Sequence, residues 1–491
     1  MSELELKLAV PDAVLPSLRH ALRAHGARSL RLQARYFDTV DGRLGRNRVA
    51  LRLRLEGRRW MQTLKTPGEG AVHRLEHEVR VPGAGASVPV IDPHRHDGSD
   101  AGSLLRAALG GAPASALAER HASDVNRLRC LVRDAHGSQI EVALDVGHAS
   151  APARSIALAE LELEHKGGPV QGVFDLAAAW IEHGGLWICT TSKADRGERL
   201  LRPQATPPTA TKARQPALAQ ATDGPALMRA VLQSTLEQVL ANTSDLAEGV
   251  TEAETIHQAR VGLRRLRTVL RELAALSPAI APSWDAVLSQ AFSKLGQRRD
   301  DEVVCAAVRP LLEAASAPLL SWRPCASTDP SVVVRETSLQ LTLLAILALA
   351  HAGAEQFTPL SPAATREWLA RRLNDLHHKV AQDGRRFEKI PLEKQHRVRK
   401  RLKRLRYLTE LTADLWPQDE MQRYLKRLPA AQDALGRHND VAVAAAAFRA
   451  EAATQPAAWF AAGYLEAHLA VTARAAHKVL GPISEAECFW K

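Results

Sequence analysis

Residues 3–7 read Glu-Leu-Glu-Leu-Lys, and residues 160–164 read Glu-Leu-Glu-Leu-Glu. Charged and apolar side chains alternate in both stretches, a period that is typical of a β-strand with one buried face. The same alternation occurs at residues 51–55, 62–65, 75–79 and 140–144. We therefore predict that the first part of the chain folds as an antiparallel β-rich domain with short flanking helices.

Composition narrows the class of protein. The chain has 491 residues and a formal net charge of +11, an excess that favours a polyanionic partner: nucleic acid, a phosphorylated metabolite, polyphosphate or an anionic membrane. Its five cysteines show no CxxC spacing, so we expect neither a zinc site nor a disulfide framework. No basic-then-apolar leader opens the chain, and the longest apolar stretch, residues 339–351, is too short to span a bilayer. These features predict a cytoplasmic protein without a transmembrane segment, and they give no indication of its oligomeric state.

The sequence changes its period after residue 203. Residues 203–224 are rich in Pro, Thr, Ala and Gln and carry no sustained apolar period, which is typical of a linker. Beyond them apolar residues recur with a helical period, as in residues 257–276 and 394–415. The predicted parts are a β-rich domain at residues 1–203, a linker at 204–222 and an all-α domain at 223–491.

The helical half contains an internal repeat. Residues 257–267 carry the pattern His-xx-Arg-xx-Leu-Arg-Arg-Leu-Arg, and residues 396–406 repeat it at an offset of 139, with one Lys for Arg. Downstream, Leu-Gly-xx-Arg-Asp at residues 295–300 matches Leu-Gly-xx-Asn-Asp at residues 435–440. This duplication predicts two pseudo-symmetric helical bundles. Their expected ranges are residues 223–355 and 356–491.

Each copy places a row of basic side chains on one helix face, at positions i, i+3, i+7 and i+10. The rows are His257, Arg260, Arg264 and Arg267 in the first copy, and His396, Arg399, Lys403 and Arg406 in the second. Like charges at this spacing repel each other, and a solvated face is the simplest explanation of a single row. Because the row occurs twice in register, we predict a linear polyanion that lies across both helices. Aromatic residues are scarce beside the rows, which disfavours single-stranded nucleic acid as that polyanion.

Charged rows of opposite sign also occur on different strands of the β-rich half, since strand residues two apart share a face. Each row alone is explained by exposure to water. If the sheet closes with its apolar residues outside, against helices, the charged rows line the lumen, where unpaired charges would be very costly. That cost would be removed if the lumen held water, a divalent metal (Mg²⁺ or Mn²⁺) and a polyanion. Candidate contacts are Glu3, Glu5 and Glu162 for the metal, and Lys7, Arg52, Arg54 and Lys65 for phosphate.

The ExExK pattern of residues 3–7 resembles the signature of the CYTH superfamily, the triphosphate tunnel metalloenzymes. Further motifs of that family follow in order along the chain. The matching stretches are residues 36–44 (YFDTVDGRL), 51–54 (LRLR), 63–65 (TLK), 74–78 (RLEHE), Arg127, 141–147 (EVALDVG), 160–164 (ELELE) and 192–197 (SKADRG). A single short motif is weak evidence, whereas this ordered series makes the resemblance specific.

The resemblance implies an eight-stranded antiparallel β-barrel, or tunnel, with flanking helices and a bound divalent metal, Mg²⁺ or Mn²⁺. It implies that the phosphates are cradled by Lys7, Arg52, Arg54, Lys65, Arg127 and Lys193. It implies that the metal is held by acids among Glu3, Glu5, Asp145, Glu160, Glu162 and Glu164. Water would then attack a terminal phosphoryl group while the metal and the basic residues neutralise the developing charge.

The two HxxR helices and the two LGxxxD elements resemble the CHAD domain, the conserved histidine α-helical domain. This resemblance covers residues 223–491. It implies that inorganic polyphosphate binds in a basic channel between two four-helix units. The second copy departs from the first at Lys403, which replaces Arg264, and at Asn439, which replaces Arg299.

Together these features predict a metal-dependent inorganic triphosphatase that converts tripolyphosphate to pyrophosphate and phosphate, with a C-terminal domain that binds long-chain polyphosphate. Thiamine-triphosphatase or class IV adenylate cyclase activity on the same tunnel is an alternative, although no base-recognition pocket can be located in the sequence. Another alternative is a non-enzymatic protein that binds polyphosphate or targets polyphosphate granules. Nucleic-acid binding is disfavoured, because no groove-reading motif occurs.

Overall fold

The computed structural model describes residues 2–68, 70, 72–82, 87–203, 206–219, 221–318 and 328–490. Side chains are described for all of these except residues 2–3, 73–74 and 297–303. The side chain of the predicted metal ligand Glu3 therefore lies outside the described residues, as do those of Arg299 and Asp300. The chain divides into two compact units: unit 1 comprises Met1–Lys212, Leu236–Ala259 and Pro330–Ala352, and unit 2 comprises Ala213–Thr235, Arg260–Asp329 and Gly353–Lys491.

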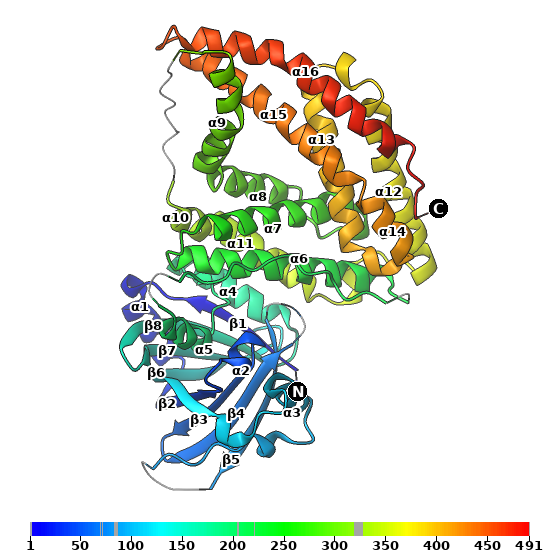
Figure 1. Cartoon of the computed structure of the whole chain (residues 1–491). Coiled ribbons are helices and arrows are strands. Elements are labelled where there is room, and N and C mark those ends of the chain that lie inside the picture. The colour runs from blue at the N-terminus through cyan, green and yellow to red at the C-terminus, as the bar shows by residue number, and fades with distance from the viewer. Residues whose placement is uncertain are drawn as a thin grey trace. The chain divides into compact units, whose positions relative to one another are not determined.

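Within the described part of unit 1, nine strands form one antiparallel sheet (Figure 1). Their order across the sheet is β5-β4-β3-β2-β6-β7-β8-β1-β9. The strands are β1 (Ser2–Ala9), β2 (Arg28–Asp38), β3 (Ala50–Glu56), β4 (Arg59–Pro67), β5 (His73–Val81), β6 (Ala118–Arg133), β7 (Gln139–Ala151), β8 (Arg154–Gly167) and β9 (Trp187–Ile188).

The helices in the described ranges follow the chain order shown by the colours of Figure 1. They are α1 (Leu15–Ala24), α2 (Arg43–Arg46), α3 (Asp100–Leu109), α4 (Gln171–Gly184), α5 (Lys193–Leu201), α6 (Gly224–Ala247), α7 (Ala253–Glu272), α8 (Ser283–Lys294), α9 (Gln297–Ala314), α10 (Pro330–Arg335), α11 (Thr337–Ala350), α12 (Pro362–Gly384), α13 (Leu392–Leu411), α14 (Gln418–Leu425), α15 (Leu428–Glu451) and α16 (Ala458–Ser484).

The apolar residues of the alternating strands form the outer face of the sheet, which helices cover. Leu53 of β3 and Leu64 of β4 are fully buried, in one cluster with Leu44 of α2 and Leu105 of α3. Helix α4 packs against β7 and β8 and buries Phe174 among its apolar residues. Since apolar side chains leave water on this outer face, the charged residues of the same strands face the interior. The predicted arrangement of strands and flanking helices is confirmed.

The sheet is tunnel-like, but it does not close along its whole length. On one side, β1 pairs with β8 over Glu5–Ala9. On its other side, β1 pairs with β5 only over Ser2–Leu4 and with the short strand β9 over Leu8–Ala9. The predicted antiparallel tunnel is thus confirmed, but the described residues form nine strands where eight were predicted, and the ring does not close throughout because β5 pairs with only three residues of β1.

The C-terminal region is entirely helical in its described residues, as predicted. Its helices recur in the same order: the long α6 and α12 precede α7 and α13, which carry the HxxR motifs, and the shorter α8 and α14 come next (Figure 1). Helices α9 and α15 follow; the first LGxxxD element spans the start of α9, whereas the second lies inside α15. The repeat in the sequence is therefore matched by a repeat in the order of helices.

Candidate functional site

A cavity of about 490 Å³ lies inside the tunnel. Its charged lining residues come from seven strands and from α5: Glu5, Arg52, Arg54, Glu56, Lys65, Glu76, Glu78, Arg127, Arg129, Glu141, Asp145, Glu162, Glu164, Lys166 and Lys193. Side-chain exposure rises from 0% at Asp145 to 51% at Arg129. The cavity therefore has a buried inner end at Asp145 and a solvated outer end near Arg129.

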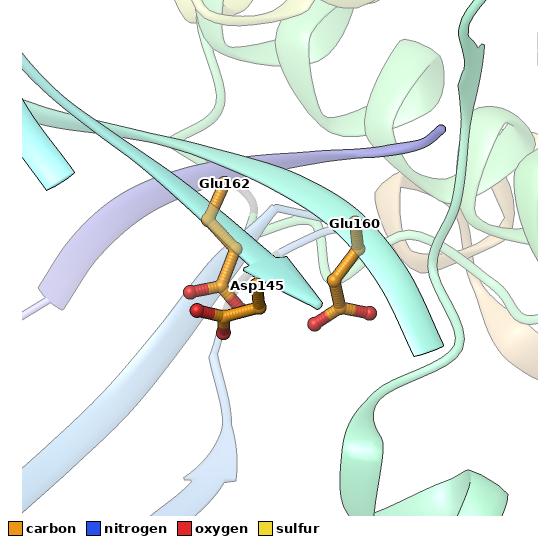
Figure 2. A group of neighbouring side chains, drawn as sticks. All are labelled: Asp145, Glu160 and Glu162. Atoms are coloured by element: carbon orange, nitrogen blue, oxygen red, sulfur yellow. The ribbon is translucent and has the colours of Figure 1, made fainter. Parts of the chain in front are cut away.

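Three carboxylates meet at the inner end of the cavity (Figure 2). Asp145 projects from β7, Glu160 and Glu162 project from β8, and one ligand atom of each lies within 4.8 Å of those of the other two. The strand register explains this meeting, since Asp145 pairs directly with Glu160 and Glu162 lies two residues away on the same face. The side chain of Glu160 is 1% exposed. Three buried carboxylates provide the hard oxygen donors that Mg²⁺ and Mn²⁺ prefer.

Two lysines compensate the negative charge of this cluster. The Lys193 ammonium lies 2.7 Å from Asp145 and 2.8 Å from Glu162, and it also pairs with Glu160. The Lys7 ammonium lies 3.6 Å from both Glu160 and Glu162. Burial alone would lower the pKa of Lys193, but the carboxylates outweigh burial and hold that pKa well above its usual value. Lys193 is therefore a permanent cation at the inner end.

Arg127 completes the set of cations around the cluster. Its Nε and Nη2 lie 2.7 Å from the two carboxylate oxygens of Asp145, and Nη2 also pairs with Glu162. Burial raises the pKa of Glu162, yet Lys193, Arg127 and Lys7 together hold it well below its usual value. Glu162 therefore remains ionised at neutral pH, as metal binding requires.

Farther out, basic side chains face acids on neighbouring strands. The Lys65 ammonium lies 2.7 Å from Glu76 on β5 and 3.5 Å from Glu5 on β1. Arg54 lies 3.0 Å from Glu78. Burial raises the pKa of Glu76, but Lys65 first and the arginines next lower it below its usual value. Five of the predicted phosphate contacts thus line the cavity, and all of these except Arg52 are paired with carboxylates of the described residues. Lys7 is not among the lining residues that the structure describes.

The predicted metal ligands do not all meet at one point. Glu5 stands opposite Glu164 in the β1–β8 ladder, whereas Glu160 stands opposite Ala9, four residues along β1. Glu5 and Glu164 therefore lie nearer the outer end, where Glu164 pairs with Lys166. Among the residues that the structure describes, the group that could share one metal ion consists of Asp145, Glu160 and Glu162.

Sequence reasoning missed several residues of this region: Glu141 and Tyr36, and also the cavity-lining Glu56, Arg129 and Lys166. Glu141 lines the cavity directly opposite Glu164, and its position four residues before Asp145 on the same strand face was a usable signal. Tyr36 is buried beside Arg52, whose Nη1 lies 3.5 Å from the phenol oxygen. No pattern distinguished this tyrosine from an ordinary core aromatic.

Helix α5 brings Lys193 to the cluster and is closely fitted to the sheet. The Ser192 hydroxyl accepts the Asp195 N–H, and the Asp195 carboxylate accepts the Ser192 N–H, so a capping box starts the helix directly before Lys193. A Cβ on Gly197 would lie 2.0 Å from Nδ1 of the buried His121 on β6. The glycine of the SKADRG stretch therefore permits the close approach of α5 to the tunnel wall.

The first basic row of the helical half follows α7, beginning with His257. The guanidinium carbons of Arg260 and Arg264 lie 4.5 and 5.4 Å from the ring centre of Phe292 on α8. Arg267 lies 2.9 Å from Asp285. Stacking on an aromatic ring holds both guanidinium groups in place and does not neutralise their charge.

The second basic row follows α13. Nδ1 of His396 lies 2.7 Å from the side-chain oxygen of Asn439, which connects the HxxR motif to the LGxxxD element of the same copy. Arg406 is paired with Glu410 at 2.6 Å. Burial, then Arg399 and Arg264, lowers the pKa of Lys403 to about 7, against the opposing effect of Asp440.

The two basic rows interact electrostatically through residues that belong to unit 2. Arg264 of α7 acts on Lys403 of α13, and Arg267 and Arg271 of α7 act on Lys400, whose pKa is lowered first by burial and then by these arginines. Sequence reasoning missed Lys400 because it lies outside the i, i+3, i+7 row. The charges of both helices therefore act on a shared region, as a channel for one polyanion requires.

No helix in the described ranges is both long and apolar enough to cross a lipid bilayer. The protein-family model for the CYTH domain matches residues 1–197, and the protein-family model for the CHAD domain matches residues 230–449. An inorganic triphosphatase from Haemophilus influenzae is 29% identical over 203 residues, which make up 40% of this chain and 54% of that protein. The chain thus spans about half the length of this relative.

Two solved structures are also similar. The CHAD domain from the plant Ricinus communis is 26% identical with a TM-score of 0.43, over 56% of this chain and 96% of that chain. A candidate adenylyl cyclase from Hippeastrum, described as having a dominant triphosphatase activity, is 17% identical with a TM-score of 0.26, over 38% of this chain and 89% of that chain. On the two family matches, the chain is a CYTH–CHAD protein, with a CYTH domain at residues 1–197 and a CHAD domain at residues 230–449.

Proposed function

We propose that the chain is a metal-dependent inorganic triphosphatase that hydrolyses tripolyphosphate to pyrophosphate and phosphate, and that its helical part binds inorganic polyphosphate. The observation that carries the first part is a group of three carboxylates, two of which line a cavity that also presents five of the predicted phosphate-binding cations. The name of the Haemophilus relative, inorganic triphosphatase, supports the same activity here.

The inner cluster fits a divalent metal. Oε2 of Glu160 is buried without a hydrogen-bond partner among the described residues, and such an orphaned oxygen is costly unless a ligand occupies it. Asp145, Glu160 and Glu162 would hold Mg²⁺ or Mn²⁺, and Glu5 and Glu164 remain candidate ligands nearer the outer end. A metal bound there would neutralise the charge that develops on the phosphoryl group.

The basic residues would bind the phosphate chain by exchanging partners. Arg54 and Lys65 now face Glu78 and Glu76, and an entering phosphate would replace those carboxylates as their partner. Arg52, Arg127 and Lys193, which line the cavity, would contact the phosphates nearer the cluster. Because arginine offers paired donors to phosphate oxygens, the substrate would be held in a defined orientation for in-line attack by water.

The cavity wall supports an inorganic substrate over a nucleotide. Its apolar part consists of Leu30, Leu32, Ala34 and Val125, and none of the lining residues that the structure describes is Phe, Tyr or Trp. A nucleotide base would find no Phe, Tyr or Trp ring to stack on, and His77, the imidazole among the described lining residues, is engaged in a hydrogen bond with His96. Tripolyphosphate needs no such surface.

Phosphate release by the purified chain tests the proposed activity. Tripolyphosphate, thiamine triphosphate and ATP are compared over a series of Mg²⁺ and Mn²⁺ concentrations, and we expect metal-dependent release that is fastest from tripolyphosphate. Faster turnover of thiamine triphosphate, or cyclic AMP formation from ATP, would favour the enzymatic alternatives. Polyphosphate binding without any turnover would favour the non-enzymatic one.

Polyphosphate binding is supported by the two basic rows of the helical part: His257, Arg260, Arg264 and Arg267 on α7, and His396, Arg399, Lys403 and Arg406 on α13. Burial first, and then repulsion by Arg399 and Arg264, lowers the pKa of Lys403. A linear polyanion would relieve that repulsion. The expected ligand is therefore a chain long enough to contact both helices.

A further inference from the structure

One arginine lies between two carboxylates beside the inner cluster. Nη2 of Arg196, on α5, lies 2.9 Å from Oε1 of Glu248 and 4.0 Å from Oε2 of Glu160. Glu248 directly follows α6, and its backbone N–H donates to the carbonyl of Ser244, so it continues the last turn of that helix. These residues all belong to unit 1.

Glu248 is held in place by more than one partner. Its other oxygen, Oε2, lies 3.1 Å from Arg199, one turn farther along α5, and Arg199 also lies 2.5 Å from Asp245. The side chains of Arg196 and Glu248 are 11% and 18% exposed. Ion pairs so little exposed to water are strong enough to fix the position of a guanidinium.

The oxygen of Glu160 that faces Arg196 is the orphaned one. Oε2 of Glu160 has no hydrogen-bond partner among the described residues, whereas Oε1 pairs with Lys193. A shift of Arg196 by about 1 Å would bring it within hydrogen-bond distance of that oxygen. The ion pair with Glu248 opposes this shift.

We propose that Glu248 is a positioning residue for the metal site: it holds Arg196 away from Glu160 and so leaves Oε2 of Glu160 available to a divalent cation. The inference rests on the metal site of the proposed function. If Arg196 were released onto Glu160, a further fixed cation would occupy the cluster, and a metal ion would have to displace it. Glu248 lies in the region matched by the CHAD model, whereas Arg196 and Glu160 lie in the region matched by the CYTH model.

Glu248→Gln is the test, with Glu237→Gln as the matched control. Glu237 lies on α6 and, like Glu248, is paired with an arginine, but that arginine is Arg48, at 2.9 Å, and not Arg196. Mn²⁺ binding to the full chain is titrated by electron paramagnetic resonance without substrate, and thermal unfolding is followed in parallel. We expect Glu248→Gln to weaken Mn²⁺ binding about tenfold, whereas Glu237→Gln leaves it unchanged.

A double variant separates positioning from a general loss of stability. In Arg196→Met/Glu248→Gln no guanidinium is left to occupy Oε2 of Glu160, so we expect Mn²⁺ affinity to return to within about twofold of the wild type. Equal Mn²⁺ affinity in Glu248→Gln and Glu237→Gln would overturn the inference, and so would a double variant that fails to recover.

The same titration distinguishes this inference from the proposed activity. If the Mn²⁺ affinities of the variants follow the expected pattern but tripolyphosphate is not hydrolysed, the role of Glu248 is supported and the proposed triphosphatase activity is refuted. A wild-type chain that does not bind Mn²⁺ would overturn both the metal site and the role of Glu248. Hydrolysis by the wild type with unchanged Mn²⁺ affinity in Glu248→Gln would overturn the role of Glu248 alone.

Discussion

Two lysines, one in each unit, lie in opposite electrostatic surroundings. Lys193 of the tunnel is buried, but Asp145, Glu160 and Glu162 hold its pKa well above the usual value. Lys403 of α13 is also largely buried, and there Arg399 and Arg264 add to the effect of burial and lower the pKa to about 7. The tunnel thus surrounds its cations with acids, whereas the helical part places cations beside one another.

The difference indicates what each region is suited to bind. A lumen in which acids and bases are interleaved can accept a metal and an anion together, since each replaces an existing partner. In the basic rows, Asp285 and Glu410 pair with Arg267 and Arg406, while the inner members repel one another. Such a region gains most from an anion alone. We therefore expect that removing one carboxylate from the tunnel strongly reduces activity. Removing one basic side chain from the rows should reduce polyphosphate affinity only slightly.

The largest expected effect is that of Glu162→Gln. The change removes a candidate metal ligand and leaves Lys193, Arg127 and Lys7 without one of their carboxylate partners. We expect metal-dependent phosphate release from tripolyphosphate to fall by about 10²- to 10³-fold, with polyphosphate binding unchanged. Glu119→Gln is the control, because Glu119 is an exposed strand carboxylate paired with Arg35. Equal activity of the two variants would show that the reaction does not depend on the inner cluster.

A smaller effect is expected from Arg260→Ala combined with Arg399→Ala. Each change removes one inner cation from a basic row, so long-chain polyphosphate should bind about tenfold more weakly and the slope of log affinity against log salt should fall by about two. Tripolyphosphate hydrolysis should not change. Arg397→Ala serves as the control, since Arg397 lies on α13 near Arg399 but is exposed and paired with Glu393. Unchanged affinity and slope in the double variant would refute the channel assignment.

The smallest effect concerns pH. Lys403 has a pKa of about 7, so it is mostly protonated below pH 7 and mostly neutral above it. Since only the protonated form attracts a polyanion, affinity for polyphosphate should fall a few-fold as pH rises from about 6 to 8. Lys403→Met should flatten this part of the pH profile, and Lys389→Met, which alters a lysine outside the rows, should not. An equally steep profile in Lys403→Met would show that another group titrates.

Much of this comparison could be predicted from the sequence, because side-chain direction in a strand or helix depends on spacing alone. The alternation at residues 160–164 identified a strand and the three glutamates on one face of it. The helical spacing from His396 to Arg406 identified the second basic row in the same way. Resemblance, not spacing, brought Lys193 into the site, since no local pattern connects it with β8.

Register and long-range ion pairs could not be predicted. Whether Glu5 meets Glu164 or Glu160 depends on a strand pairing between the start of the chain and β8, and a shift of register would have changed the metal cluster. The separation of Glu5 from the inner group was therefore invisible in the sequence. The pairing of Arg196 with Glu248 depends on how α5 packs against the end of α6, which no periodicity records.

β1 comes long before its main partner strand, β8, in the sequence, and this separation affects how the tunnel is made during synthesis. β1 shares three residue pairs with β5, but its main ladder is with β8, which ends at Gly167, and its remaining edge belongs to β9, which ends at Ile188. A nascent chain must therefore keep its first strand largely unpaired until those later strands leave the ribosome. Lys7 meets Glu160 and Glu162 only at that stage. A ribosome-bound fragment that ends before β8 thus lacks a tunnel, and its folding can be completed only after most of the first family region has been translated.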